Sequence, residues 1–124
     1  MKFLLLVYTD PQCMAELGDA EFDSEMRGCL QHADELQAEG TLLGYQQLEP
    51  TDTARAVRQR GGRWAVTDGP FAETKEMLAG FNLIEAPSME EAVRIAQSFP
   101  WVKYGCIEVR PVRDVSAVRA RVGA

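Results

Sequence analysis

The segment that most constrains the fold of this chain is an apolar run near its start. Residues 3–8 are Phe, three leucines, Val and Tyr, without the polar alternation of a strand that has one face in water. Such a run predicts a central strand of a sheet, covered on both faces. Any fold for this chain must therefore supply two covering layers.

Two predicted helices would supply one layer. The first is expected from near Asp19 to Gly40, and its opposite face, which includes Glu25, is expected in solvent. Its apolar stripe consists of Phe22, Met26, Cys29, Leu30, Ala33 and Leu36. The second helix follows Ser88, which with Glu91 forms a capping box in which each side chain bonds the other residue's backbone N–H. Pro100 is expected to stop this helix.

The remaining segments predict strands and turns. A loop is expected between the first strand and Asp19, and Gly61-Gly62 predicts a tight two-residue turn between two hairpin strands. The predicted strands are residues 41–48, 53–60, 63–67, 77–85 and 104–109. This order indicates an α+β, ferredoxin-like split βαβ fold with an inserted β-hairpin, whose antiparallel sheet carries two helices on one face. A partner subunit is the expected cover for the other face. Residues 1–112 are expected to form the domain and residues 113–124 a tail with a short helix.

The most distinctive stretch runs from Val66 to Glu76 and joins the hairpin to the next strand. In it, Asp68-Gly69 is a turn pair, because Asp bonds nearby backbone and Gly accepts a positive φ. Pro70 fixes its own φ and restricts Gly69. We expect a rigid loop, which suits a functional site.

This stretch carries a family resemblance. Asp68-Gly69-Pro70-Phe71, followed by residues 73–76 (Glu-Thr-Lys-Glu), resembles the signature of the DGPF family, a branch of the YCII-related proteins. Residues 48–50 and 108–112 extend the match. The resemblance implies a homodimer whose sheets face each other in a dimeric α+β barrel. Related proteins carry a His early in the first helix and an Asp before the Pro that ends the second, where this chain has Cys29 and Phe99. Their acid–base chemistry is therefore not expected here.

Composition limits the partners and the location. The chain has 124 residues and a net charge of −6, which argues against nucleic acid or an anionic membrane as the main partner. Its apolar start is short and lacks a signal-peptide cleavage site. Three widely spaced cysteines fit free thiols in a reducing compartment, so a cytoplasmic location is expected. No metal site is expected, because the single His32 has no further ligand at helical spacing. No cofactor is expected.

Four residues near the signature are the candidate ligand contacts, namely Asp68, Phe71, Arg58 and Glu73. Asp68 is also a weak catalytic candidate as an acid, a base or an orienting group. Each has a simpler alternative. Asp68 would cap its own turn, Glu73 would lie in solvent or pair with Lys75, and Arg58 would belong to a solvated hairpin. A buried, inert thiol is the expected state of Cys29.

Three functions stay open on the sequence. The preferred hypothesis is a homodimeric domain that binds or senses a small ligand in a pocket near the Asp68 loop. The first alternative is a small enzyme acting on a small organic substrate through Asp68. The second is an interaction module that assists a transcription regulator. An enzyme predicts a buried ionisable group in a concave site, whereas an interaction module predicts an exposed apolar patch and no pocket.

Overall fold

The first strand, β1 (Lys2–Thr9), lies inside a four-stranded antiparallel sheet with the order β2-β5-β1-β6, as the apolar run predicted. The computed structural model describes residues 1–70 and 74–124. The other sheet strands are β2 (Leu42–Gln47), β5 (Met77–Glu85) and β6 (Gly105–Pro111). The helices are α1 (Pro11–Ala15), α2 (Asp19–Ala38), α3 (Met89–Gln97) and α4 (Val115–Val122), and two 3-10 turns are η1 (Thr51–Thr53) and η2 (Pro100–Lys103). This topology confirms the predicted ferredoxin-like split βαβ fold.

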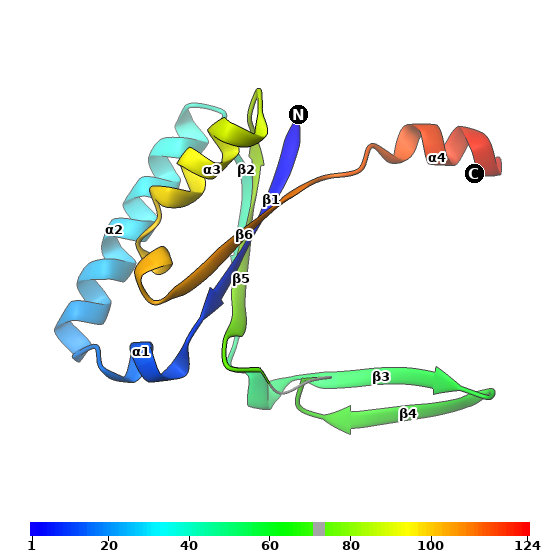
Figure 1. Ribbon diagram of the computed structural model, residues 1–124, viewed down its shortest axis with the longest axis horizontal. Coiled ribbons are helices and arrows are strands. Elements are labelled where there is room, and N and C mark those ends of the chain that lie inside the picture. The colour runs from blue at the N-terminus through cyan, green and yellow to red at the C-terminus, as the bar shows by residue number, and fades with distance from the viewer. Residues whose placement is uncertain (71–73) are drawn as a thin grey trace.

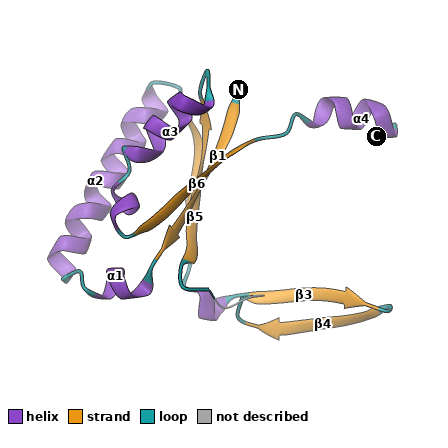
Figure 2. Ribbon diagram, in the orientation of Figure 1, coloured by secondary structure: helices purple, strands orange, loops and turns teal. Residues whose placement is uncertain are grey.

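The core lies between the sheet and the two longer helices. Alternate residues of β1, Phe3, Leu5 and Val7, are buried beneath α2 and α3, and Ile84 of β5 lies beside Phe3. Figures 1 and 2 show both helices on the same side of the sheet. Burial of this apolar area is the main stabilising term of the fold.

In the described part of the chain, no helix or second sheet covers the other face of the four-stranded sheet. Leu4, Leu6 and Tyr8 alternate with the core residues of β1 and are only partly buried. The hairpin β3 (Arg55–Arg60) and β4 (Arg63–Asp68) forms a separate two-stranded sheet, which we call the arm. Figure 1 shows the arm and α4 extending away from the body on the side opposite α2 and α3. The predicted inserted hairpin is thus present, and its tight turn has the expected positive φ at both glycines, 56° and 77°.

Several local predictions need correction. The expected loop before Asp19 contains α1, because Asp10 accepts a hydrogen bond from the Gln12 N–H at 2.9 Å and Pro11 occupies the first helical position. The predicted capping box is only half formed. Ser88 accepts from the Glu91 N–H at 3.2 Å, but the Glu91 carboxylate pairs with Arg94 at 2.8 Å instead of reaching back.

Two further observations concern the chain ends. The tail contains α4, as predicted, while the domain division at residue 112 stays a prediction. Among the described residues, none of the helices has the length and apolar character needed to cross a membrane.

Candidate functional site

The signature loop is tied to the base of the arm. Gly69 follows β4 with a φ of 87°, as its turn position predicted, and its N–H donates to the Ala54 carbonyl at 2.8 Å. The hydroxyl of Thr74 donates to the Glu76 carbonyl within the same loop. Phe71 and Glu73, two of the predicted ligand contacts, lie outside the described residues. The alternative partner predicted for Lys75 was Glu73, whereas the Lys75 ammonium lies 3.7 Å from the Asp10 carboxylate.

Asp68 is brought to Arg55 and not to Arg58. The Arg55 Nε lies 3.0 Å from Asp68 Oδ1, and the two residues are cross-strand partners in the arm. The Asp68 side chain is 86% exposed, so this pair lies in water and contributes little to stability. Arg58 stands opposite Ala65, on the other face of the arm. Arg58 and Asp68 therefore lie on opposite faces of the arm and do not pair with each other.

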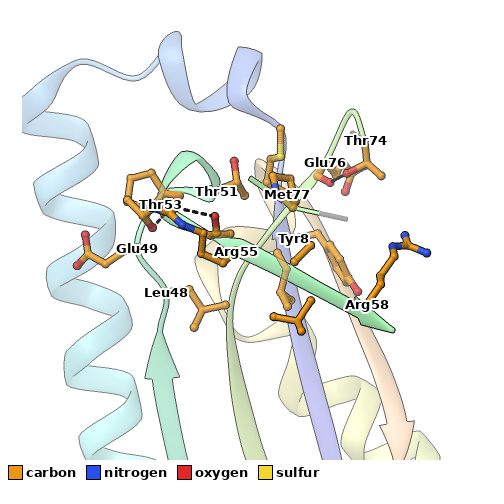
Figure 3. Close-up of a pocket in the computed structure, with 16 residues that line it drawn as sticks. Tyr8, Leu48, Glu49, Thr51, Thr53, Arg55, Arg58, Thr74, Glu76 and Met77 are labelled. Carbon is orange, nitrogen blue, oxygen red and sulfur yellow. Dashed lines mark hydrogen bonds between the residues drawn. The ribbon is translucent and has the colours of Figure 1, made fainter. Parts of the chain in front are cut away.

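A cavity of about 970 Å³ lies where the arm joins the sheet, and we call it the hairpin-root cavity. Figure 3 shows Arg55 on the side of the Thr51–Thr53 turn and Arg58 on the other side of the cavity. The residues that line it are Tyr8, Leu48, Glu49, Pro50, Thr51, Thr53, Ala54, Arg55, Ala56, Val57, Arg58, Pro70, Thr74, Glu76, Met77 and Leu78. The lining combines apolar side chains with charges of both signs. The cavity also adjoins the signature loop through Pro70 and Thr74.

The two arginines at this cavity differ in their partners. The Arg55 guanidinium is occupied by Asp68 and also donates to the Ala54 carbonyl at 3.1 Å. Arg58 forms no ion pair with any carboxylate in the described part of the chain. Among the described residues that line this cavity, Arg58 is therefore a cation without a carboxylate partner, although Glu49 and Glu76 line the same cavity. Its guanidinium can bind an anion such as a carboxylate or a phosphate.

A second cavity, of about 270 Å³, lies between the sheet and α2, and we call it the sheet–helix cavity. The residues that line it are Val7, Thr9, Met14, Phe22, Met26, Cys29, Tyr45, Gln46, Gln47, Leu48, Ala79, Gly80, Phe81, Asn82 and Trp101. None of these side chains carries a charge. Asn82 was not among the site residues predicted from the sequence, although a polar residue within the apolar strand 77–85 was a usable signal.

The sheet–helix cavity includes Cys29, at the position where the family resemblance implied a His. Cys29 is 8% exposed, and its sulfur accepts a hydrogen bond from Trp101 Nε1 at 3.3 Å. Burial raises the pKa of the Cys29 thiol, and the Trp101 hydrogen bond opposes this effect. The thiol therefore stays protonated near neutral pH and is a poor nucleophile, as the sequence predicted. Phe99, where relatives carry an Asp, is a core residue.

Glu25 of α2, which was predicted to lie in solvent, belongs to an ionic cluster. Glu25 is partly buried, and its Oε2 lies 2.6 Å from the Lys103 ammonium and accepts from the Tyr104 hydroxyl at 2.9 Å. Hydrogen bonds from Lys103 and Tyr104 lower the pKa of Glu25, and the same contacts raise the pKa of Lys103 and of Tyr104. The cluster joins α2 to the turn before β6. Helical periodicity alone could not reveal partners that are 78 or 79 residues away.

The histidine lies at the edge of the core. His32 Nε2 is 2.7 Å from the Ser98 hydroxyl, and its ring packs edge-on against Phe99 with centroids 5.2 Å apart. Its Nδ1 lies 3.8 Å from an exposed Glu35 carboxylate. In the part of the chain that the structure describes, no group of three or more His, Cys, Asp or Glu side chains could hold a metal ion.

Comparison with known proteins identifies the family. The YCII-related domain matches residues 1–116. The "Uncharacterized protein R00369" of Rhizobium meliloti (strain 1021) is 34% identical over 114 residues, which cover 90% of this chain and 92% of that relative.

The fold resembles a solved enzyme structure. This enzyme is 5-chloro-2-hydroxyhydroquinone dehydrochlorinase (TftG) from Burkholderia phenoliruptrix AC1100, in complex with 2,5-dihydroxybenzoquinone. The two chains superpose with a TM-score of 0.54 over 91% of this chain and 94% of the other, at 15% identity. At that identity the likeness shows the fold. The family match and the Rhizobium relative together show that this chain belongs to the YCII-related family.

Proposed function

We propose that this protein is a homodimeric domain that binds a small organic anion in the hairpin-root cavity. The observation that carries the proposal is the cavity of about 970 Å³, with Arg58 at its wall free of any described carboxylate. A volume of this order is that of a pocket for a small molecule, and an arginine fork recognises a carboxylate or a phosphate.

A second copy of the chain is the proposed cover for the open face of the sheet. The central strands present a partly buried apolar stripe there, which includes Leu6 and, opposite it on β5, Phe81. One face of the arm adds the cross-strand pair Val57 and Val66, exposed by 61% and 62%, and Trp64, exposed by 71%. The arm and α4 project on the side of the sheet opposite the helices (Figure 1). Several large apolar side chains exposed on one face favour a protein interface there.

The ligand class is inferred from the lining. Tyr8, Leu78 and Val57 offer apolar surface, and Arg58 offers a cation. TftG holds a small oxygenated ring, which supports the idea that this fold accommodates such compounds. Phe71 and Glu73 stay predicted contacts of the same site. A cytoplasmic location stays part of the proposal, supported by the three free cysteines.

Binding is favoured over the two alternatives. A general base must be held within reach of the substrate in a concave site, whereas the Asp68 side chain is 86% exposed and paired with Arg55. The relatives' His and Asp are replaced by Cys29 and Phe99. A pure interaction module predicts no pocket, and the hairpin-root cavity weighs against it.

The assembly is tested by a pair of charge substitutions on opposite faces of the arm. Val66→Glu and Thr67→Glu both alter exposed residues, but only Val66 lies on the apolar face with Val57. We expect wild type and Thr67→Glu to sediment at low micromolar concentration with twice the chain mass of 13.8 kDa, and Val66→Glu to sediment as a monomer. A folded wild-type monomer, or equal behaviour of the two variants, would refute the proposed interface.

The ligand is tested by native mass spectrometry and by titration with benzoate as a probe. Arg58→Ala is matched by Arg60→Ala, which removes the same charge from the same face of the arm but not from the cavity wall. We expect Arg58→Ala to lose retained anionic ligand and benzoate binding, while Arg60→Ala keeps both. Equal losses would assign binding to the general charge of the arm and not to the cavity.

A further inference from the structure

The sheet–helix cavity is lined by a buried amide that has no hydrogen-bond partner among the described residues. Asn82 is 8% exposed, and the register places it between Leu5 and Tyr45 on the helix-facing side of the sheet. Its side chain makes none of the hydrogen bonds found among the described residues. Its polar atoms are nevertheless not sealed in the interior, because no fully buried side-chain nitrogen or oxygen lacks a partner in this part of the chain. The polar atoms of the amide therefore remain accessible from the cavity that Asn82 lines.

A buried amide of this kind is costly without a partner. Removing a carboxamide from bulk water without a compensating hydrogen bond is unfavourable, so a polar group in the cavity would stabilise the folded protein. The amide offers a carbonyl acceptor and two N–H donors. It can therefore bind either a carbonyl or a hydroxyl of a bound molecule.

The backbone next to Asn82 is irregular and closely packed. The pairing of β1 with β5 shifts between Val7 and Tyr8, so Ala79 is an extra residue of β5 next to the cavity. Gly80 follows, and a Cβ there would lie 2.6 Å from the Gln46 carbonyl oxygen of β2. β-Bulges often lie next to functional sites, where they redirect side chains.

The walls select a flat, uncharged molecule. Phe22 and Trp101 lie with ring centroids 6.0 Å apart, and Met14 and Met26 add adaptable thioether side chains. Gln47 donates to the Met26 sulfur at 3.2 Å in an exposed position, which places this contact at the rim. Since the lining has no charged side chain, an ion would lose its hydration without gaining a counter-charge. A volume of about 270 Å³ limits the ligand to a small molecule.

We propose that the sheet–helix cavity is a second binding site, which takes a small neutral aromatic molecule bearing one carbonyl or hydroxyl that hydrogen-bonds to Asn82. This site differs from the hairpin-root cavity in its ligand and its walls, and it does not depend on the function proposed above. Trp101 and Cys29 form one end of the site, and their mutual hydrogen bond holds the indole in place.

The test is an NMR titration of the full chain with acetophenone as the probe and ethylbenzene as its counterpart without the carbonyl. Two indole N–H signals serve as reporters, because Trp101 lines the cavity and Trp64 lies exposed on the arm. We expect acetophenone to shift the Trp101 indole and Asn82 amide signals saturably and to leave the Trp64 signal in place. Ethylbenzene should move the Asn82 amide much less.

A pair of amide-to-leucine variants then tests the role of Asn82. Asn82→Leu removes the buried amide, and Gln37→Leu removes an exposed one from α2. The loss of one neutral hydrogen bond predicts that Asn82→Leu binds acetophenone about threefold to tenfold more weakly, with ethylbenzene affinity kept and Gln37→Leu like wild type. If Asn82→Leu does not fold, the two wild-type titrations decide the question. A cavity that holds water only would give no saturable shift at Asn82 and Trp101. That result, or an unchanged acetophenone affinity in folded Asn82→Leu, would overturn the proposal.

Discussion

Replacing Gly69 by alanine should destabilise the protein for a conformational reason alone. Gly69 has a φ of 87°, and a Cβ built on it meets no described atom within 4 Å. Steric contact with those neighbours therefore contributes nothing to the expected cost. An L-residue in the left-handed region costs about 1–2 kcal/mol, and the lower entropy of the unfolded alanine chain offsets part of this. The expected loss in the free energy of unfolding is about 1 kcal/mol.

The assay is urea denaturation at fixed protein concentration, together with thermal melting. For a chain of this length, a loss of about 1 kcal/mol corresponds to a decrease in Tm of roughly 4 °C. The slope of unfolding against urea should not change, because the exposed surface is the same. Gly69→Asn should lose roughly half as much stability, because asparagine tolerates this backbone region better.

The matched control is the same substitution in a helix. Gly28 lies inside α2 on an exposed position, again with no atom within 4 Å of a built Cβ. Gly28→Ala should therefore stabilise the protein by roughly 0.5–1 kcal/mol, since glycine is the poorer helix former. The two substitutions thus have opposite expected signs. An unchanged Tm for Gly69→Ala, with Gly28→Ala stabilising, would refute the claim that this turn requires a left-handed residue.

Two further predictions concern carboxylates. Asp68→Asn should leave folding and the dimer intact. If Asp68 contacts the ligand as predicted, native mass spectrometry should show that the variant has lost its bound ligand. If Asp68 has only a structural role in the turn, the variant should keep the ligand. For Glu25, the pKa is lowered in the folded state, so its contribution to stability is present above the unfolded value of about 4.3 and is lost as the pH falls through the lowered pKa. Wild type should therefore be more stable than Glu25→Gln at neutral pH, and urea titrations should show this advantage shrinking below about pH 4; an advantage that stays constant there would contradict the assigned cluster.

The features predicted correctly from the sequence depend on neighbouring residues. The Gly61-Gly62 turn, the Ser88 cap and most of the apolar stripe of α2 are encoded within a few positions, so periodicity and turn chemistry identify them. Leu30 was wrongly included in that stripe, because its side chain is 38% exposed. The doubly apolar run at residues 3–8 likewise placed β1 inside the sheet. The loop predicted before Asp19 was wrong although a local signal existed, because Asp10 and Pro11 form a standard helix start.

The features that were missed depend on pairing across the fold. Glu25 was assigned to solvent from its helical phase, but Lys103 and Tyr104 reach it from the far end of the chain. The arm register decided that Asp68 meets Arg55 and that Arg58 stays free of it. Asn82 could be recognised as a site residue only from the structure, in which it lines a cavity. The sequence supplies such groups, and the tertiary structure decides which of them meet.

The irregular pairing of β1 with β5 lies where the two candidate sites adjoin, and Leu48 lines both cavities. Before the bulge at Ala79, Leu78 and its partner Tyr8 line the hairpin-root cavity. After it, Gly80 and its partner Val7 line the sheet–helix cavity. Because successive residues of a strand point to opposite faces, one extra residue changes which side chains face which cavity. The charged arm thus borders one cavity while the uncharged core borders the other, and their expected ligands differ in charge for this reason.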